Sequence, residues 1–162
     1  VISHASGDEG FEYEKHVRNY SDLIGVKTVF VSDRINDRRH ANAQGGPVYA
    51  LEDVYPHADL VTYPSDLEGF GNAFLETVYF RKPIVVNTYS VYAMDIRPKG
   101  FRAVELNGYV TEEAVRQTAR ILDDAELRKE IVDHNYELGR KYYSYQVLER
   151  KLHSLVADCL GV

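Results

Sequence analysis

Residues Asp66–Glu76 read DLEGFGNAFLE, and the fold of the chain can be predicted outward from this stretch. Before it, Leu60–Tyr63 is predicted to be a short apolar strand. After its glycines, Gly71–Arg81 is predicted to be a helix, which Pro83 closes because proline cannot continue a helix and restricts the residue before it. The stretch is therefore predicted to be a strand-to-helix turn.

The turn combines glycines with two flanking carboxylates. Gly69 and Gly71 allow the backbone to approach a ligand closely, and the first N–H groups of the following helix lack partners inside it. Such a terminus attracts anions, phosphates above all. Glu68 and Glu76 lie on either side at an E-x7-E spacing. Taken alone, the turn is explained equally well by tight chain reversal and by phosphate binding.

Predicted strands and helices alternate along the chain. The strands are expected in Val1–Gly7, Val26–Val31, Leu60–Tyr63, Ile84–Asn87 and Arg102–Leu106. The helices are expected in Phe11–Ile24, Val48–His57, Gly71–Arg81, a segment that begins at Thr111 and ends at Asp123-Asp124, Ala125–Tyr143 and Tyr145–Leu160. Gly25 is expected to be the C-cap of the first helix. The segments Ser32–Pro47 and Thr88–Gly100 are expected to be irregular. This order indicates an α/β fold with a Rossmann-like, doubly wound parallel sheet and helices on both faces. Ligands bind such sheets at the carboxyl ends of the strands, where the turn lies.

Composition narrows the class of protein. A chain of 162 residues is expected to form one domain with its own core. The net charge of −6 gives no basic footprint for nucleic acid, so no nucleic-acid partner is expected. No apolar run approaches the roughly 20 residues of a membrane span. One cysteine, Cys159, fits a reducing compartment, so we expect a cytoplasmic protein, and the six histidines lack the spacing of a metal site.

Residues Ala58–Val86, ADLVTYPSDLEGFGNAFLETVYFRKPIVV, resemble the donor-binding core of retaining glycosyltransferases of family 4, or group 1, which have the GT-B fold and typically read ADxxxxPSxxEGFGxxxLEAMAxGxPVV. The likeness extends to Phe11–Val31, Asp124–Arg128 and Tyr143–Leu148. It implies that residues 1–162 are a single donor-binding domain, one half of a GT-B fold. It also implies a C-terminal fragment that lacks the N-terminal acceptor domain and the first strand of this domain.

The resemblance also implies a reaction. Enzymes of this family transfer a hexose from a nucleotide-diphosphate sugar to an acceptor hydroxyl, with retention and without a cofactor or catalytic metal. The nucleotide sugar is thus the expected partner, and the acceptor is expected to bind through the N-terminal domain. Peripheral membrane contact of the full-length protein is left open. The isolated fragment is expected to be inactive.

Individual roles carry over by position. Glu68 corresponds to the first glutamate of the E-x7-E pair, beside the transferred hexose, and is the expected catalytic residue. Glu76 corresponds to the carboxylate that accepts hydrogen bonds from the ribose. The donor's sugar and diphosphate are expected at the backbone of Gly69, Phe70, Gly71, Asn72 and Ala73, and Asp33 and Arg34 lie where the family's loop touches the base.

Other functions stay open. The chain could be a non-catalytic nucleotide-binding or interaction module of the same fold, or belong to another GT-B enzyme such as a sugar-nucleotide epimerase. A glycosidase is disfavoured, because its paired carboxyl groups lie about 5 to 9.5 Å apart, whereas the Cα atoms of Glu68 and Glu76 are expected about 10 Å apart or more. Asn87–Tyr92 departs from the small glycines that the family usually has there, which puts substrate specificity in question.

Overall fold

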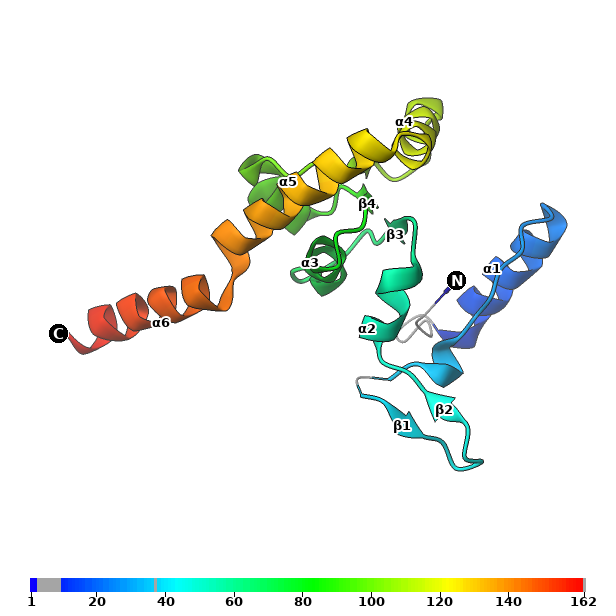
Figure 1. Ribbon diagram of the computed structural model, residues 1–162, viewed down its shortest axis with the longest axis horizontal. Coiled ribbons are helices and arrows are strands. Elements are labelled where there is room, and N and C mark those ends of the chain that lie inside the picture. Colours follow the sequence, from blue (N-terminus) through cyan, green and yellow to red (C-terminus); the bar gives the residue numbers. More distant parts are fainter. Residues whose placement is uncertain (3–9, 37, 162) are drawn as a thin grey trace. The chain divides into compact units, whose positions relative to one another are not determined.

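The computed structural model describes residues 1–2, 10–36 and 38–161 and divides into two compact units, Val1–His57 and Ala58–Val162. The single domain that the sequence predicts stays a prediction. Most of the strand predicted in Val1–Gly7 lies outside the described residues. Figure 1 shows the elements in chain order, coloured from blue to red.

The first unit begins with helix α1, Gly10–Leu23. Gly25 follows it with a φ of 71°, as predicted for a C-cap glycine. The strand predicted at Val26–Val31 is wrong, because among the described residues only Phe30 forms a bridge there, parallel to Ile2. A strand needs a partner along its length, and without one Val26 stays 54% exposed.

The segment predicted to be an irregular loop contains regular structure. Ser32–Arg34 forms the 3-10 helix η1, and β1, His40–Ala41, pairs antiparallel with β2, Pro47–Val48. The side chain of Asn42 organises the connecting turn, since its Oδ1 accepts from the N–H of Gly46 at 2.8 Å. Short polar side chains form such turns through local hydrogen bonds. The segment therefore has no hydrophobic pattern from which its strands could be predicted.

The helix predicted at Val48–His57 is shorter than expected. Val48 ends β2, helix α2 spans Leu51–Val54, and Tyr55–His57 continues as the 3-10 helix η2. Asp53 stabilises the start of α2, because its carboxylate accepts from the N–H of Ala50 at 3.0 Å.

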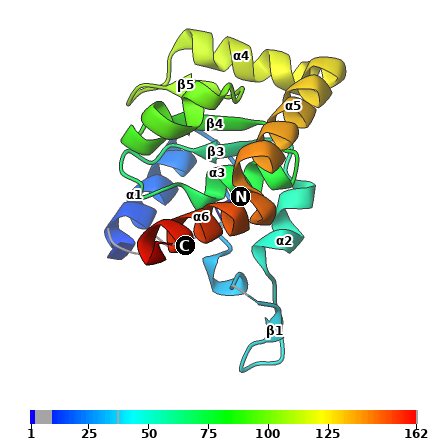
Figure 2. The same cartoon turned by 90° about the vertical axis from the view of Figure 1, so that its left-hand side faces the viewer.

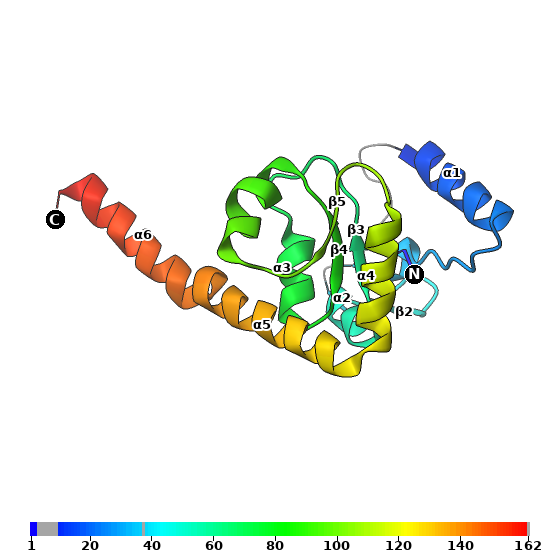
Figure 3. The same cartoon turned by 90° about the horizontal axis from the view of Figure 1, so that it is seen from above.

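The second unit contains a parallel sheet. Its strands are β3, Val61–Tyr63, β4, Ile84–Asn87, and β5, Val104–Leu106, in the order β3-β4-β5 that Figure 2 shows. Helices cover both of its faces, with α3, Asn72–Tyr79, on one and α4, Glu112–Asp123, on the other (Figure 3). Helix α5, Ala125–Tyr143, packs against both of these helices. The predicted α/β fold with a parallel sheet between helices is confirmed.

Alternate side chains of β4 enter two separate cores, as the pleat of a strand requires. Ile84 and Val86 pack with aromatic residues on the α3 side, in a cluster with Phe74, Val78, Tyr89, Tyr92, Ile96 and Phe101. Val85 faces the α4 side, where it packs against Val104, Leu106, Ala114, Ile121 and Ile131. The central strand is thus covered on both faces, which is why Ile84–Val86 reads as a continuous apolar run.

The segment Thr88–Gly100 was predicted to be irregular, and this is wrong. Tyr92–Ile96 forms the π-helix η3, and Arg97–Lys99 follows as the 3-10 helix η4. Tyr92 and Ile96 are fully buried. Their four-residue spacing was a helical signal that the tyrosines and Pro98 obscured.

Side-chain caps begin the two helices after β5. The Thr111 hydroxyl accepts from the Ala114 N–H at 3.1 Å and confirms the predicted N-cap of α4. Asp124, which was predicted to break the chain's helical course, caps α5 by accepting from the Leu127 N–H at 2.9 Å. Each such cap satisfies a helix N–H that would otherwise lack a partner.

The last helix, α6, Tyr145–Leu160, leads away from the sheet and contributes no buried residue (Figures 1 and 3). Its apolar side chains stay about half exposed, Leu148, Leu152 and Leu155 among them. Over the described ranges, no helix has both the length and the apolar character needed to cross a membrane.

We expect Asn135→Ala to lower the free energy of unfolding by about 2 kcal/mol. The Asn135 side chain is 1% exposed and bonds both the N–H and the C=O of Arg102, at 2.8 and 2.7 Å. Its removal leaves two backbone groups without their partner. Urea denaturation measures the change. Gln117→Ala is the matched control, because the Gln117 amide bonds Glu113 on an exposed helix surface and its loss should cost less than about 0.5 kcal/mol. Equal costs for both variants would contradict the expectation.

Candidate functional site at the carboxyl edge of the sheet

The turn from β3 to α3 lies at the carboxyl edge of the parallel sheet, as predicted. Gly71 is the N-cap of α3, with a φ of 91° and a ψ of 61°. This left-handed conformation is costly for a residue with a side chain, whereas glycine adopts it readily. The strand therefore turns sharply into the helix at one residue.

Space as well as conformation excludes a side chain at Gly71. A Cβ built on Gly71 would lie 2.0 Å from the hydroxyl oxygen of Tyr89, far inside van der Waals contact. Tyr89 is 2% exposed and donates its O–H to the carbonyl of Phe70 at 3.2 Å. Its ring also meets the ring of Tyr63 edge-on, with centroids 6.1 Å apart. Two tyrosines thus support the turn from the side of the core.

The electrostatics of the turn centre on Glu68, which is partly buried. Burial raises the pKa of Tyr63 well above its ordinary value, and the hydrogen-bonding Glu68 carboxylate raises it further. Burial raises the pKa of Tyr89 to about 12, and the charge of Glu68 adds to this. A negative charge next to a hydroxyl disfavours its ionisation, so both tyrosines are held as neutral O–H groups.

Asn87 connects the loops that follow all three strands. It lies at the end of β4 and is 7% exposed. Its amide nitrogen donates to Asp66 in the turn after β3, and its Oδ1 accepts from the N–H of Gly108, after β5, at 2.8 Å. The carboxyl edge is therefore held together by one buried amide.

Most of the predicted donor-binding residues gather at the start of α3. Gly71 is its N-cap, Phe70 precedes the cap, and Asn72 and Ala73 begin its first turn, where no side chain forms a capping hydrogen bond. Glu76 follows on the same helix and is partly buried. Asp33 and Arg34 belong to the first unit, where they lie in η1 with their charged atoms 3.9 Å apart. The site described for the second unit therefore does not include them.

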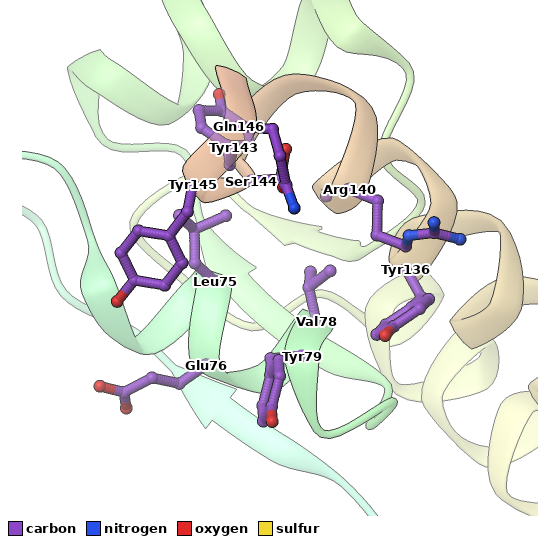
Figure 4. Close-up of a pocket in the computed structure, with 11 residues that line it drawn as sticks. Leu75, Glu76, Val78, Tyr79, Tyr136, Arg140, Tyr143, Ser144, Tyr145 and Gln146 are labelled. Atoms are coloured by element: carbon purple, nitrogen blue, oxygen red, sulfur yellow. The ribbon is translucent and has the colours of Figure 1, made fainter. Parts of the chain in front are cut away.

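A pocket of about 390 Å³ lies on the α5 side of α3, between α3 and the junction of α5 with α6. Leu75 and Val78 form its apolar floor, and Tyr136, Tyr145 and Arg140 surround it (Figure 4). The Glu76 carboxylate points away from these apolar residues (Figure 4). Glu76, one of the predicted donor-binding residues, is nevertheless among the residues that line this pocket.

Three residues support the turn although the sequence did not predict this role for them. Asn87 and Tyr89 were recognised only as part of a segment that departs from the family pattern, and Tyr63 only as the end of a strand. Asn87 and Tyr89 bond partners 21 and 19 residues away in sequence, and Tyr63 meets the ring of Tyr89 from a different strand end. The one signal in the sequence for this support was that Tyr89 follows the end of β4 by only two residues.

The basic residues near the edge are engaged elsewhere. Arg97 pairs with Glu105 at 3.0 Å, Lys99 with Asp95 at 2.7 Å and Arg102 with Glu130 at 2.6 Å. The hydroxyl of Tyr92 also donates to Glu105, at 3.0 Å. The Arg97 pair and the Tyr92 hydrogen bond join η4 and η3 to β5, whereas the Arg102 pair joins the segment before β5 to α5. Among the described residues, no three acidic, histidine or cysteine side chains gather as metal ligands would.

We expect Gly71→Ala to destabilise the fold by about 3 kcal/mol, from the left-handed backbone and the overlap with Tyr89 together. Urea denaturation measures the loss. Gly69→Ala is the control from the same turn, because a Cβ at Gly69 meets nothing within 4 Å. It should change the free energy of unfolding by less than about 0.5 kcal/mol. Similar losses at both glycines would show that space beside Tyr89 is not the constraint.

We expect the free energy of unfolding to fall as the pH rises above about 10, because unfolded tyrosine ionises there. The pKa values of Tyr63 and Tyr89 are raised in the fold, the second to about 12. Their contribution is complete below the unfolded pKa and is lost as the pH rises through the folded one. Denaturation at about pH 8 and about pH 11 measures the fall. Tyr89→Phe should reduce it, whereas Tyr145→Phe, which removes a side chain that is 88% exposed, should not. An unchanged fall in Tyr89→Phe would contradict this.

Known proteins have sequences similar to this one. The family pattern described as glycosyl transferases group 1 matches residues 43–138. Mannosylglucosylglycerate synthase of Thermotoga maritima is 34% identical over 154 residues, which cover 87% of this chain and 34% of that protein. Mannosylglucosylglycerate synthase of Petrotoga mobilis is 37% identical over 98 residues, or 60% of this chain and 22% of that protein. This chain thus spans about a third of the first relative and about a fifth of the second. Because the family pattern covers more than half of it, including β3, the turn and α3, the chain belongs to the group 1 glycosyl transferases.

Proposed function

We propose that this chain is the donor-binding domain of a retaining glycosyltransferase, which transfers a hexose from a nucleotide-diphosphate sugar to an acceptor hydroxyl. The observation that carries this proposal is the uncapped start of α3 at Gly71, placed between Glu68 and Glu76 in a chain of this family. The acceptor binds to the remaining part of the longer protein. We propose a cytoplasmic location for it.

The chemistry of transfer fits the start of α3. Breaking the bond between the sugar and the diphosphate builds negative charge on the departing phosphate. Peptide N–H groups fixed in advance stabilise that charge, and the loss of one such donor typically costs about 100-fold in rate. The N–H groups of Gly71, Asn72 and Ala73 serve this purpose, supported by the positive end of the helix dipole. No metal is required for this step.

The two glutamates have different tasks in this proposal. Glu68 lies beside the transferred hexose, where its carboxylate positions the sugar or stabilises the positive charge that develops on it. Glu76 accepts hydrogen bonds from the ribose hydroxyls and orients the nucleotide. Such contacts far from the reacting bond supply the binding energy that aligns it.

The transferred sugar is proposed to be mannose. The two relatives are both mannosylglucosylglycerate synthases, and the first of them matches this chain over 87% of its length. A mannosyl donor is therefore the first candidate for this site.

Titration of the ¹⁵N-labelled 162-residue chain tests the proposal. UDP, GDP and ADP are added singly, followed by their sugars, GDP-mannose included. We expect saturable amide shifts at Gly71, Asn72 and Ala73 for one nucleotide. Glu76→Gln should weaken that binding about 10-fold, because it replaces a charged acceptor of two hydrogen bonds by a neutral amide.

Glu126→Gln is the control, an equal change of charge in the first turn of α5. It should leave the affinity within about twofold of the original, since exposed surface charges act weakly at a distance. A folded chain without shifts for any nucleotide would contradict donor binding, as would an equal loss in both variants.

A further inference from the structure

Tyr89 joins two loops at the carboxyl edge. It follows β4 by two residues, yet its hydroxyl reaches the carbonyl of Phe70 in the turn after β3, at 3.2 Å. Its own backbone is anchored, because its N–H donates to Asn87 at 2.9 Å and its carbonyl accepts from Ala93 at 3.0 Å. The ring is buried within the cluster on the α3 side of the sheet. The hydroxyl is therefore held at a fixed position beside the turn.

The planarity of the peptide bond gives this contact a second effect. The carbonyl of Phe70 and the N–H of Gly71 belong to one peptide group and point in opposite directions in a trans peptide. Because the carbonyl points at Tyr89 and the core, the N–H of Gly71 points away from them. Among the described residues, that N–H donates to no protein acceptor.

The lack of a side chain at Gly71 allows this arrangement. Any Cβ at Gly71 would overlap both the hydroxyl and Cζ of Tyr89, at 2.0 and 2.9 Å. The peptide can therefore turn its carbonyl towards the hydroxyl only at a glycine. Tyr63 supports Tyr89 through the edge contact of their rings.

We propose that Tyr89 is a positioning residue of the donor site, whose hydroxyl fixes the Phe70–Gly71 peptide so that the Gly71 N–H is directed towards the diphosphate of the donor. This inference rests on the proposed function of the turn. It assigns a task to a residue in the segment Asn87–Tyr92, where the chain departs from the family pattern.

The charges around Tyr89 favour a neutral donor at this place. Burial raises the pKa of Tyr89 to about 12, and Glu68 and Tyr143 add to the rise. The hydroxyl thus keeps its proton through the neutral range and can donate it to Phe70. An ionised Tyr89 would repel the Phe70 carbonyl and the diphosphate alike.

Two measurements on Tyr89→Phe test the proposal, and Tyr92→Phe is the matched control. Tyr92 lies in the same buried cluster and is fully buried, but its hydroxyl donates to Glu105 rather than to the turn. The first measurement needs no ligand. Residual dipolar couplings and relaxation of the ¹⁵N-labelled chain report the direction and the order of the Gly71 N–H.

In the unsubstituted chain and in Tyr92→Phe, we expect one fixed direction and an order parameter near about 0.85. In Tyr89→Phe, the Gly71 coupling should change and its order parameter should fall below about 0.6, while the couplings of β4 and α5 stay the same. An unchanged Gly71 coupling in Tyr89→Phe overturns the proposal.

The second measurement is the affinity for the nucleotide diphosphate that binds the unsubstituted chain. Tyr89→Phe should weaken it about 10-fold, as expected for a misdirected donor to a charged group, and Tyr92→Phe should leave it within about twofold. A changed Gly71 coupling with full affinity overturns the link to the donor. If no nucleotide binds the unsubstituted chain, the proposed function is wrong, and the couplings alone still decide whether Tyr89 directs the peptide.

Discussion

The close approach of Gly71 to Tyr89 is the constraint on which the carboxyl edge of this domain depends. A strand and a helix can be joined by many turns, but this one places a left-handed residue against a buried hydroxyl. The backbone at Gly71 therefore has no freedom to rotate without losing the bond to Phe70 or overlapping Tyr89. Rigidity at this point comes from the hydrophobic core rather than from the loop's own hydrogen bonds.

The core can supply this rigidity because both faces of the short sheet are covered. The aromatic cluster around Phe74 fills the α3 side, and the aliphatic cluster around Val104 fills the other. Asn87 then links the loops after the three strands through one buried amide. The Tyr89 hydroxyl joins the loops after β3 and β4 as well, and the Thr88 hydroxyl bonds Leu106 and Asn107 at the end of β5.

Local patterns predicted the second unit better than the first. The apolar run at β4, the proline after α3, the predicted cap Thr111 and the helix break predicted at Asp123-Asp124 are signals within a few residues, and the elements they indicated were found with boundaries shifted by at most two residues. The strand predicted at Val26–Val31 was wrong because β-branched composition indicates an extended chain but not a partner, and among the residues that the structure describes only Phe30 is paired there.

The residues of the candidate site likewise fall into two groups, those that local sequence reveals and those whose roles depend on distant contacts. The glycines and glutamates of the turn were recognisable from the sequence, because their spacing and the family pattern are local features. The contacts of Tyr63, Asn87 and Tyr89 were not, because they join segments that the fold alone brings together. Propensity and periodicity carry no information on which tyrosine will meet which glycine.

The pairing of a glycine with a tyrosine explains why the departure at Asn87–Tyr92 is compatible with an intact turn. A large residue after β4 needs space, and the space it occupies is the volume that a side chain at Gly71 would have taken. The turn therefore keeps its glycine for two reasons, its left-handed backbone and its neighbour. A smaller residue in place of Tyr89 would remove the overlap with a side chain at Gly71, but it would leave the Phe70 carbonyl without its hydrogen-bond donor. The position of the Phe70–Gly71 peptide, in the loop after β3, is thus fixed by Tyr89 in the loop after β4. The two loops therefore depend on each other.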